Sequence, residues 1–130
     1  MILDLRNILH SEASWSYQKT EKAQVIDWAI NEKIFVRITL PDNLFEWFVD
    51  ILDSNKKILV SDWSEVYGKP KDILILELKN DIEDFCKTIS QHATRFISER
   101  KWPYTYKKFQ IFNNGSWKDI LSNRKFKLIK

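Results

Sequence analysis

The chain has 130 residues, of which 44% are hydrophobic and 30% charged, and its formal net charge is a modest +3. The length predicts one globular domain over residues 1–130, and the composition excludes a disordered chain. The single cysteine excludes an intrachain disulfide, and two widely separated glycines exclude a glycine-rich phosphate-binding loop. No apolar stretch approaches the roughly 20 residues of a membrane span and the N-terminus has no signal-peptide cleavage site, so we expect a cytoplasmic protein without a membrane partner.

The first third of the chain has weak periodicity. Apolar residues at helical spacing predict a short helix over residues 2–10. Residues 13–19 alternate between small or polar and aromatic side chains, which predicts a strand or an aromatic-rich loop. Thr20 is a suitable cap for a helix over residues 20–30, although the apolar run over residues 25–30 is also compatible with an extended segment.

In the middle of the chain, apolar residues stand at every second position, with Phe35 and Phe48 among the otherwise polar residues between them. This period of two predicts half-buried strands over residues 34–40 and 45–51, and a third strand that begins at Ile58. Residues 41–43 and 53–56 have the composition of turns. The three strands are therefore expected to form an antiparallel meander of two hairpins.

A long amphipathic helix is predicted over residues 70–89. Pro70 suits the first turn of a helix. Apolar residues then recur at spacings of three and four, namely Ile75, Leu78, Ile82, Phe85 and Ile89. The compact apolar run over residues 73–78 leaves a rival interpretation, in which a strand precedes a shorter helix that begins at a capping box of Asn80 and Glu83.

The last third predicts a strand pair over residues 94–100 and 104–112, with the bend at Trp102-Pro103. Ser116 is a suitable cap for a last short helix that ends at Leu121. Strands gathered around one long helix predict an α+β fold, with an antiparallel sheet of about five strands packed against that helix and short terminal helices.

The titratable residues contain no recognised catalytic or metal-binding motif. His10 and His92 lie at predicted helix ends, where a lone histidine is more often a cap or a surface group than an acid–base catalyst. Cys86 lies on the apolar face of the long helix, which predicts a buried and inert thiol. We therefore predict no catalytic residue, no metal ligand and no cofactor.

One short constellation leaves an enzymatic alternative. Pro41-Asp42 followed by Glu77-Leu78-Lys79 resembles the signature of restriction-endonuclease-like nucleases, in which two acids hold a divalent metal and a lysine positions or deprotonates water. On a strand, Glu77 and Lys79 would point to the same side, whereas on a helix they lie about 200° apart. Because the helix is favoured here, a metal-dependent nuclease is the alternative function and not the first.

The last third also combines aromatic and basic residues that suit base stacking and phosphate contacts. These residues are Arg95, Phe96, Arg100, Lys101, Trp102, Tyr104, Tyr106, Lys107 and Lys108. The aromatic residues alternate as they do in half-buried strands, which favours aromatics in the core and lysines in water. An RNA-binding module is therefore a further alternative, and nucleic acid is not the expected partner.

Charge is distributed unevenly along the chain. Residues 42–84 hold eleven acidic and five basic residues, whereas residues 85–130 hold two acidic and eleven basic residues. Such asymmetry indicates either a dipolar surface that attracts a charged partner or two segments that neutralise each other within one fold.

Acidic and large aromatic residues lie close together between residues 42 and 72. The predicted partner-binding residues are Glu46, Asp50, Asp62, Trp63, Glu65 and Tyr67. An acidic surface with Trp and Tyr anchors suits the capture of a basic protein, because aromatics supply desolvated anchors and charges steer the encounter. The alternative for Trp63 and Tyr67 is that they close the end of the sheet.

Part of the chain resembles the small immunity proteins that neutralise polymorphic toxins, or toxins of contact-dependent growth inhibition, in bacteria. The resemblance covers roughly residues 44–86 and rests on Phe45-Glu46-Trp47-Phe48-Val49-Asp50, Ser61-Asp62-Trp63, Tyr67-Gly68 and a helix with Asp81-Ile82-Glu83-Asp84-Phe85. It implies a cytoplasmic, non-enzymatic protein that binds a cognate toxin domain and occludes its active site or an essential surface. Many such toxins are nucleases with basic faces. The last third of this chain is basic, whereas such immunity proteins are commonly acidic, and this difference leaves the location of the interface open.

Overall fold

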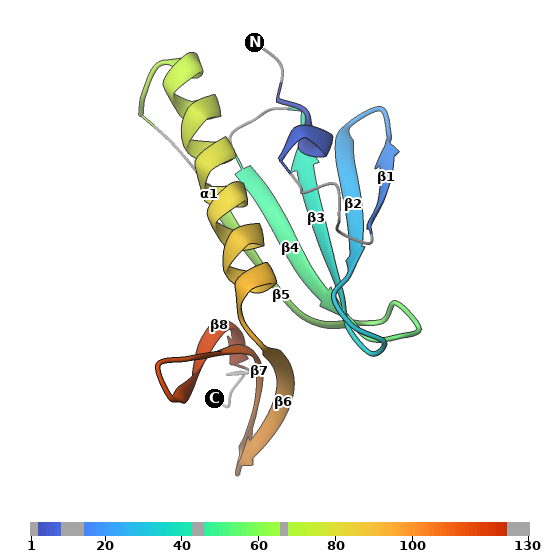
Figure 1. Ribbon diagram of the computed structural model, residues 1–130, viewed down its shortest axis with the longest axis vertical. Coiled ribbons are helices and arrows are strands. Elements are labelled where there is room, and N and C mark those ends of the chain that lie inside the picture. The colour runs from blue at the N-terminus through green and yellow to red at the C-terminus, as the bar shows by residue number, and fades with distance from the viewer. Residues whose placement is uncertain (1–2, 9–14, 43–45, 66–67, 125–130) are drawn as a thin grey trace.

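The structure, a computed structural model, describes residues 3–8, 15–42, 46–65 and 68–124, with side chains as far as residue 121. These ranges contain two antiparallel sheets, one α-helix and one 3-10 helix (Figure 1). The large sheet has the order β1 (Trp15–Lys19), β2 (Ala23–Ala29), β3 (Phe35–Pro41), β4 (Glu46–Leu52) and β5 (Ile58–Glu65). The small sheet has the order β6 (Thr94–Lys101), β7 (Tyr104–Asn113) and β8 (Ser116–Arg124). With η1 (Leu5–Asn7) and α1 (Lys71–Gln91), this is the predicted α+β fold.

One hydrophobic core joins η1, the large sheet, α1 and the small sheet. In Figure 1, α1 runs along the β4–β5 side of the large sheet, and the small sheet lies beyond the C-terminal end of the helix. Within the described residues, no helix combines the length and the apolar composition needed to cross a membrane.

The long helix is confirmed, and the rival strand over residues 73–78 is wrong. α1 begins directly after Pro70 and continues for 21 residues. Its buried side chains form one stripe, made of Leu74, Ile75, Leu78, Ile82, Cys86 and Ile89. Burial raises the pKa of the Cys86 thiol to about 12, as fits an unreactive core residue. His92 caps the helix, with Nδ1 2.8 Å from the Thr88 carbonyl oxygen, whereas His10 lies outside the described residues.

The antiparallel meander of the middle segment is also confirmed. Val36 pairs with Ile51 and Ile38 pairs with Val49, so the apolar residues of β3 and β4 fall on one face. The turn between β4 and β5 is closed by Asp53, whose Oδ1 atom accepts hydrogen bonds from the N–H groups of Asn55 and Lys57. These local bonds explain why the Asp-Ser-Asn sequence makes a turn.

The predicted helix over residues 20–30 is wrong, because residues 23–29 form β2 between β1 and β3. Burial along this strand alternates residue by residue, with Ile26 and Trp28 buried. The Thr20 hydroxyl accepts a hydrogen bond from the Ala23 N–H at 3.1 Å, but it does so in the β1–β2 turn. The β-branched and aromatic residues of the segment favour a strand once neighbouring strands supply partners.

The predicted helix over residues 116–121 is wrong as well, since Ser116 opens β8. Asn114 and Gly115 both have positive φ angles, 52° and 81°, and they connect β7 to β8. An Asn-Gly pair is a strong signal for a two-residue hairpin turn, because both positions must adopt left-handed backbone angles. The terminal helices of the prediction thus reduce to η1 in the part of the chain that the structure describes.

A buried glutamine ties the N-terminal segment to the large sheet. Gln24 is 6% exposed, and its Oε1 atom accepts a hydrogen bond from the Leu5 N–H at 2.9 Å. Its Nε2 group donates to the Leu3 carbonyl at 2.7 Å, and the Tyr17 hydroxyl also donates to Oε1 at 3.2 Å. One side chain therefore satisfies the backbone that places Leu3 and Leu5 in the core.

Replacing Gln24 by leucine is expected to lower the free energy of unfolding by about 1–3 kcal/mol, because it leaves a buried N–H and a buried carbonyl unpaired. Urea denaturation monitored by tryptophan fluorescence measures the change. Gln18→Leu is the matched control, since Gln18 is exposed on the neighbouring strand and its replacement should shift stability by no more than about 0.5 kcal/mol. Equal losses in both variants would contradict this role for Gln24.

Candidate functional site

The large sheet has an inner face, which packs against α1 and η1, and an opposite face, here called the open face. The inner face carries the core residues of β2, β3 and β4. Neither described helix covers the open face, whose side chains are mostly half-buried or exposed. On β2 to β5 it includes Val25, Asp27, Arg37, Thr39, Glu46, Phe48, Asp50, Ser61, Trp63 and Glu65.

A row of charged residues crosses the centre of the open face. Arg37 donates two hydrogen bonds to the Asp27 carboxylate, at 2.6 and 2.9 Å, and Lys56 Nζ lies 3.1 Å from the same carboxylate. The hydrogen bond from Arg37 is the main cause that lowers the pKa of Asp27. Asp50 pairs in register with Arg37 on one side and accepts a hydrogen bond from the Ser61 hydroxyl on the other. Asp50 is thus held within an ordered polar row.

An aromatic pair lies beside this row, at the β5 edge. Trp63 pairs in register with Phe48, and its side chain is 55% exposed. Glu46 and Glu65 form the next pair along the two strands. This pair places two carboxylates side by side at this edge. Glu46, Phe48, Trp63 and Glu65 are called the Trp63 surface below.

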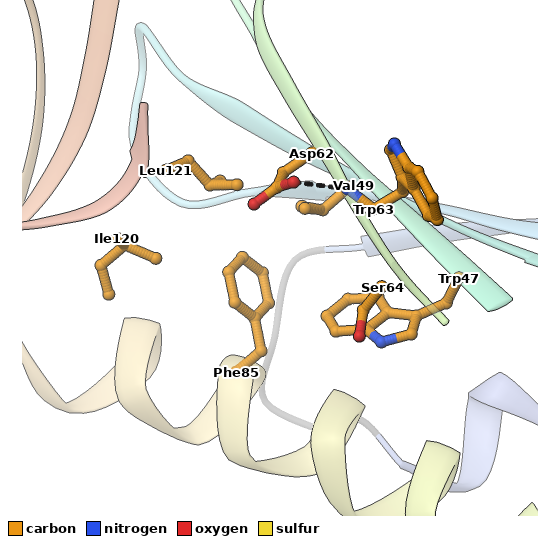
Figure 2. Close-up of a pocket in the computed structure, with 8 residues that line it drawn as sticks. All are labelled: Trp47, Val49, Asp62, Trp63, Ser64, Phe85, Ile120 and Leu121. Atoms are coloured by element: carbon orange, nitrogen blue, oxygen red, sulfur yellow. Dashed lines mark hydrogen bonds between the residues drawn. The ribbon is translucent and has the colours of Figure 1, made fainter. Parts of the chain in front are cut away.

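Asp62 lies on the other side of the same strand. Neighbouring residues of a strand point to opposite faces, so Asp62 and Ser64 lie on the inner face while Trp63 lies on the open face. There they line a cavity of about 110 Å³ between β4, β5, α1 and β8. Figure 2 shows the Asp62 carboxylate between Val49 and Leu121, and the Trp63 indole turned away from the cavity.

The remaining walls of the cavity are mostly apolar. They include Trp47, Val49, Phe85, Ile120 and Leu121 (Figure 2). The rings of Trp47 and Phe85 meet edge to face, with their centroids 5.6 Å apart. One Asp62 oxygen accepts a hydrogen bond from the Trp63 N–H at 2.8 Å, which fixes the carboxylate at the cavity.

The structure divides the predicted partner-binding residues between two faces. Glu46, Trp63 and Glu65 lie together, with Asp50 in the neighbouring row, whereas Asp62 lies on the inner face. Tyr67 lies outside the described residues. Phe48 and Trp47 also belong to the two sites, although neither was among the predicted partner-binding residues. Neighbouring residues of a strand point to opposite faces, so the alternation along β4 and β5 assigns each residue to one of the two sites.

The three residues of the nuclease alternative bind three different partners. Asp42 forms an ion pair with Lys19 at 3.2 Å, and Glu77 pairs with Lys69. Lys79 pairs with Glu83 one turn along α1 at 3.7 Å, and the helix places Glu77 and Lys79 about 200° apart around its axis. Across the described part of the chain, no three His, Cys, Asp or Glu side chains gather to hold a metal ion.

Several basic residues of the small sheet are engaged in contacts within the sheet. The Arg95 guanidinium lies 4.2 Å from the centre of the Trp117 ring and donates to Gln110 Oε1 at 2.7 Å. Lys108 lies within 4 Å of both Glu99 and Asp119.

Comparisons of the chain with protein-family models, with curated proteins and with solved structures found no match.

Proposed function

We propose that the chain is a non-enzymatic binding protein that docks a basic protein on the Trp63 surface. The observation that supports this most directly is a half-exposed Trp63 beside Phe48, with the carboxylates of Glu46 and Glu65 next to them. Trp is among the residues that contribute most to binding energy at protein interfaces. Carboxylates at the rim increase the rate of encounter with a positively charged partner.

The partner is proposed to be a bacterial toxin domain, which the chain neutralises as an immunity protein. The resemblance of residues 44–86 supports this class of partner, because β4 and β5 carry much of it. With the toxin docked on the Trp63 surface, the bulk of this chain would cover the active site or an essential surface of the toxin, with no chemical step. Asp50 and Asp62 would contribute negative charge from the neighbouring row and from the inner face.

The Trp63 surface is a better interface than the basic last third of the chain. Lys108 lies within 4 Å of Glu99 and Asp119, so its charge is partly neutralised, and the Arg95 guanidinium is already engaged by Gln110 and the Trp117 ring. Residues 46–65 contain five acids but only two lysines, both in the turn before β5. This contrast supports a cationic partner on the large sheet over RNA on the small sheet.

Coexpression with the toxin tests the proposal. If a secreted protein is encoded beside this chain, its C-terminal domain is expected to co-purify with the chain and to lose its toxicity. Glu46→Lys together with Glu65→Lys should slow association by at least tenfold at low salt. Glu32→Lys is the control, since Glu32 is exposed in the β2–β3 turn.

Two results would contradict the proposal. Hydrolysis of nucleic acid by the purified chain, lost on changing Asp42 or Glu77, would establish the nuclease alternative. RNA binding that weakens steeply with salt, in the absence of toxin binding, would establish the RNA-binding alternative.

A further inference from the structure

The turn between β6 and β7 carries the most exposed large apolar side chain of the described residues. Lys101 pairs in register with Tyr104, so Trp102 and Pro103 form a two-residue turn at the tip of the hairpin. Trp102 is 81% exposed there. Tryptophan is enriched at protein interfaces, where its ring supplies a large contact area. An indole presented in this way is a candidate anchor for another molecule.

The hairpin that presents Trp102 is strongly basic. Residues 94–108 hold five basic residues and one acidic residue, Glu99. Arg100 is exposed and forms no ion pair with another described residue, and the Lys101 side chain is 68% exposed although its Nζ atom lies 3.3 Å from Glu99. Arg100, Lys101 and Trp102 are called the Trp102 tip below. A surface that binds this tip must combine negative charge with a group against which an indole packs.

The chain itself has a surface of this kind. The Trp63 surface presents the carboxylates of Glu46 and Glu65 beside Phe48 and the half-exposed ring of Trp63. Carboxylates are the natural partners of guanidinium and ammonium groups, and aromatic rings pack on each other edge to face or offset. Residues 46–65 hold five acidic and two basic residues, the opposite balance to that of the hairpin.

The two surfaces of one molecule lie too far apart to meet. Glu65 ends β5 and lies shortly before α1, whereas β6 begins at Thr94, after the helix has ended. A helix of 21 residues is about 30 Å long, and the β6–β7 hairpin extends beyond its C-terminal end (Figure 1). The Trp63 surface and the Trp102 tip therefore lie toward opposite ends of the molecule, and contact between them requires two copies.

We propose that copies of this chain associate head to tail, with the Trp102 tip of one copy on the Trp63 surface of the next. The two indoles pack against each other, and the two bases of the tip face the two carboxylates of the Trp63 surface. Because the two patches differ, the contact is heterologous, and in a dimer each copy keeps one unfilled patch. So few side chains bury less than the roughly 1,200 Å² of a standard interface, which makes the association weak and sensitive to salt.

This association occupies the surface assigned to the toxin, so the two contacts exclude each other. That consequence rests on the proposed function, whereas the contact between copies does not. Addition of the toxin domain is then expected to dissociate the copies.

Sedimentation velocity of the purified chain, without any partner, tests the contact. At low salt the weight-average sedimentation coefficient is expected to rise between about 10 μM and about 1 mM, the range of a weak interface, and salt of about 0.3 M should abolish the rise. Trp102→Ala should weaken the association at least tenfold, because it removes the anchor. A chain that stays monomeric at low salt over this range would overturn the proposal, and so would association that Trp102→Ala leaves unchanged.

Charge reversal identifies the two patches. Arg100→Glu combined with Lys101→Glu should weaken association at least tenfold, because like charges then face each other. Glu46→Lys combined with Glu65→Lys should do the same. An equimolar mixture of the two double variants should associate again, since each patch of one is then complementary to a patch of the other. A mixture that stays monomeric, while circular dichroism shows both variants folded, would refute this pairing of patches.

Lys22→Glu combined with Lys33→Glu is the matched control. Both lysines are exposed in turns of the large sheet, and their reversal changes the net charge as much as reversal of the Trp102 tip does. Association should stay within twofold of that of the native chain.

The same measurements separate this inference from the proposed function. Toxin docking by a chain that stays monomeric would refute only the head-to-tail contact, whereas self-association without toxin docking would refute only the proposed function. A monomeric chain that binds RNA or vesicles of anionic lipid, and loses that binding in Trp102→Ala, would overturn the inference and assign the Trp102 tip to that ligand.

Discussion

Replacing Trp63 by alanine is expected to weaken binding of the partner by about 30-fold to 1000-fold. The change removes an aromatic anchor, and such anchors contribute about 2–4 kcal/mol to binding, where every 1.4 kcal/mol is tenfold in Kd. The fold should tolerate the substitution, because the Trp63 side chain is 55% exposed and its main described neighbour is Phe48 on the adjacent strand. Isothermal titration calorimetry with the purified toxin domain measures the loss.

Leu76→Ala is the matched control for Trp63→Ala. Leu76 has the same exposed fraction, 55%, but lies on the solvent-facing side of α1. Alanine also favours the helix, so this variant should leave both Kd and stability nearly unchanged. Thermal denaturation of both variants separates lost binding from lost folding. Unchanged affinity in Trp63→Ala would remove the Trp63 surface from the interface.

Stability should fall only slightly in Trp63→Ala. Cross-strand aromatic pairs contribute roughly 0.2–1 kcal/mol relative to alanine. A larger loss would mean that Trp63 closes the end of the sheet, which was the other interpretation of this residue from the sequence. The size of the stability change thus decides between an anchor for a partner and a structural plug.

Sequence patterns predicted the elements in which the apolar residues recur at the regular spacing of a strand or a helix. β3 and β4 bury an apolar residue at every second position, and the buried stripe of α1 runs from Leu74 to Ile89. In each case the period of the apolar residues matches the face that is buried, so local sequence and final packing agree.

The two incorrect helices arose where local preference was weak and tertiary pairing decided. Residues 23–29 form an inner strand because β1 and β3 supply partners on both sides; the local sequence was compatible with both a helix and an extended segment. Residues 116–121 form β8 because Asn114-Gly115 turns the chain back on β7. The Asn-Gly turn directly before Ser116 decides the structure of this segment, and the capping potential of Ser116 is not used.

Composition predicted which segment carries the candidate site, but only the structure shows which of its side chains lie together. Acidic and aromatic residues between 42 and 72 indicated a binding region, and the structure brings Glu46, Trp63 and Glu65 to one edge. Asp62 was grouped with Trp63 because they are adjacent in sequence, whereas a strand separates adjacent side chains onto opposite faces. The cavity could not be predicted, since it combines residues of β4, β5, α1 and β8.

Replacing Phe109 by alanine is expected to lower the free energy of unfolding by about 3–5 kcal/mol, as is typical for removing a buried phenylalanine. Phe109 is fully buried on β7, where it lies in register with Phe96 of β6 and Leu121 of β8. It belongs to the same core as the large sheet, so its loss opens a cavity between the two sheets. Because small domains have only about 5–15 kcal/mol of stability, the effect is large.

Phe112→Ala is the control for Phe109→Ala. Phe112 lies on the same strand but is exposed, and its described ring contact is with Trp117, at a centroid distance of 5.3 Å. Losing that aromatic pair should cost about 0.5–1.5 kcal/mol. Urea denaturation followed by fluorescence and by circular dichroism compares the two variants.

The shape of the unfolding transition tests whether the two sheets fold as one unit. If the core that Phe109 shares with β4, β5 and α1 couples them, Phe109→Ala shifts a single transition to lower urea and both probes report the same midpoint. Two transitions, of which only the less stable one shifts, would mean that the small sheet unfolds by itself. In that case the cavity between β4, β5, α1 and β8 would open under conditions in which the large sheet remains folded, because Ile120 and Leu121 of β8 form part of its wall.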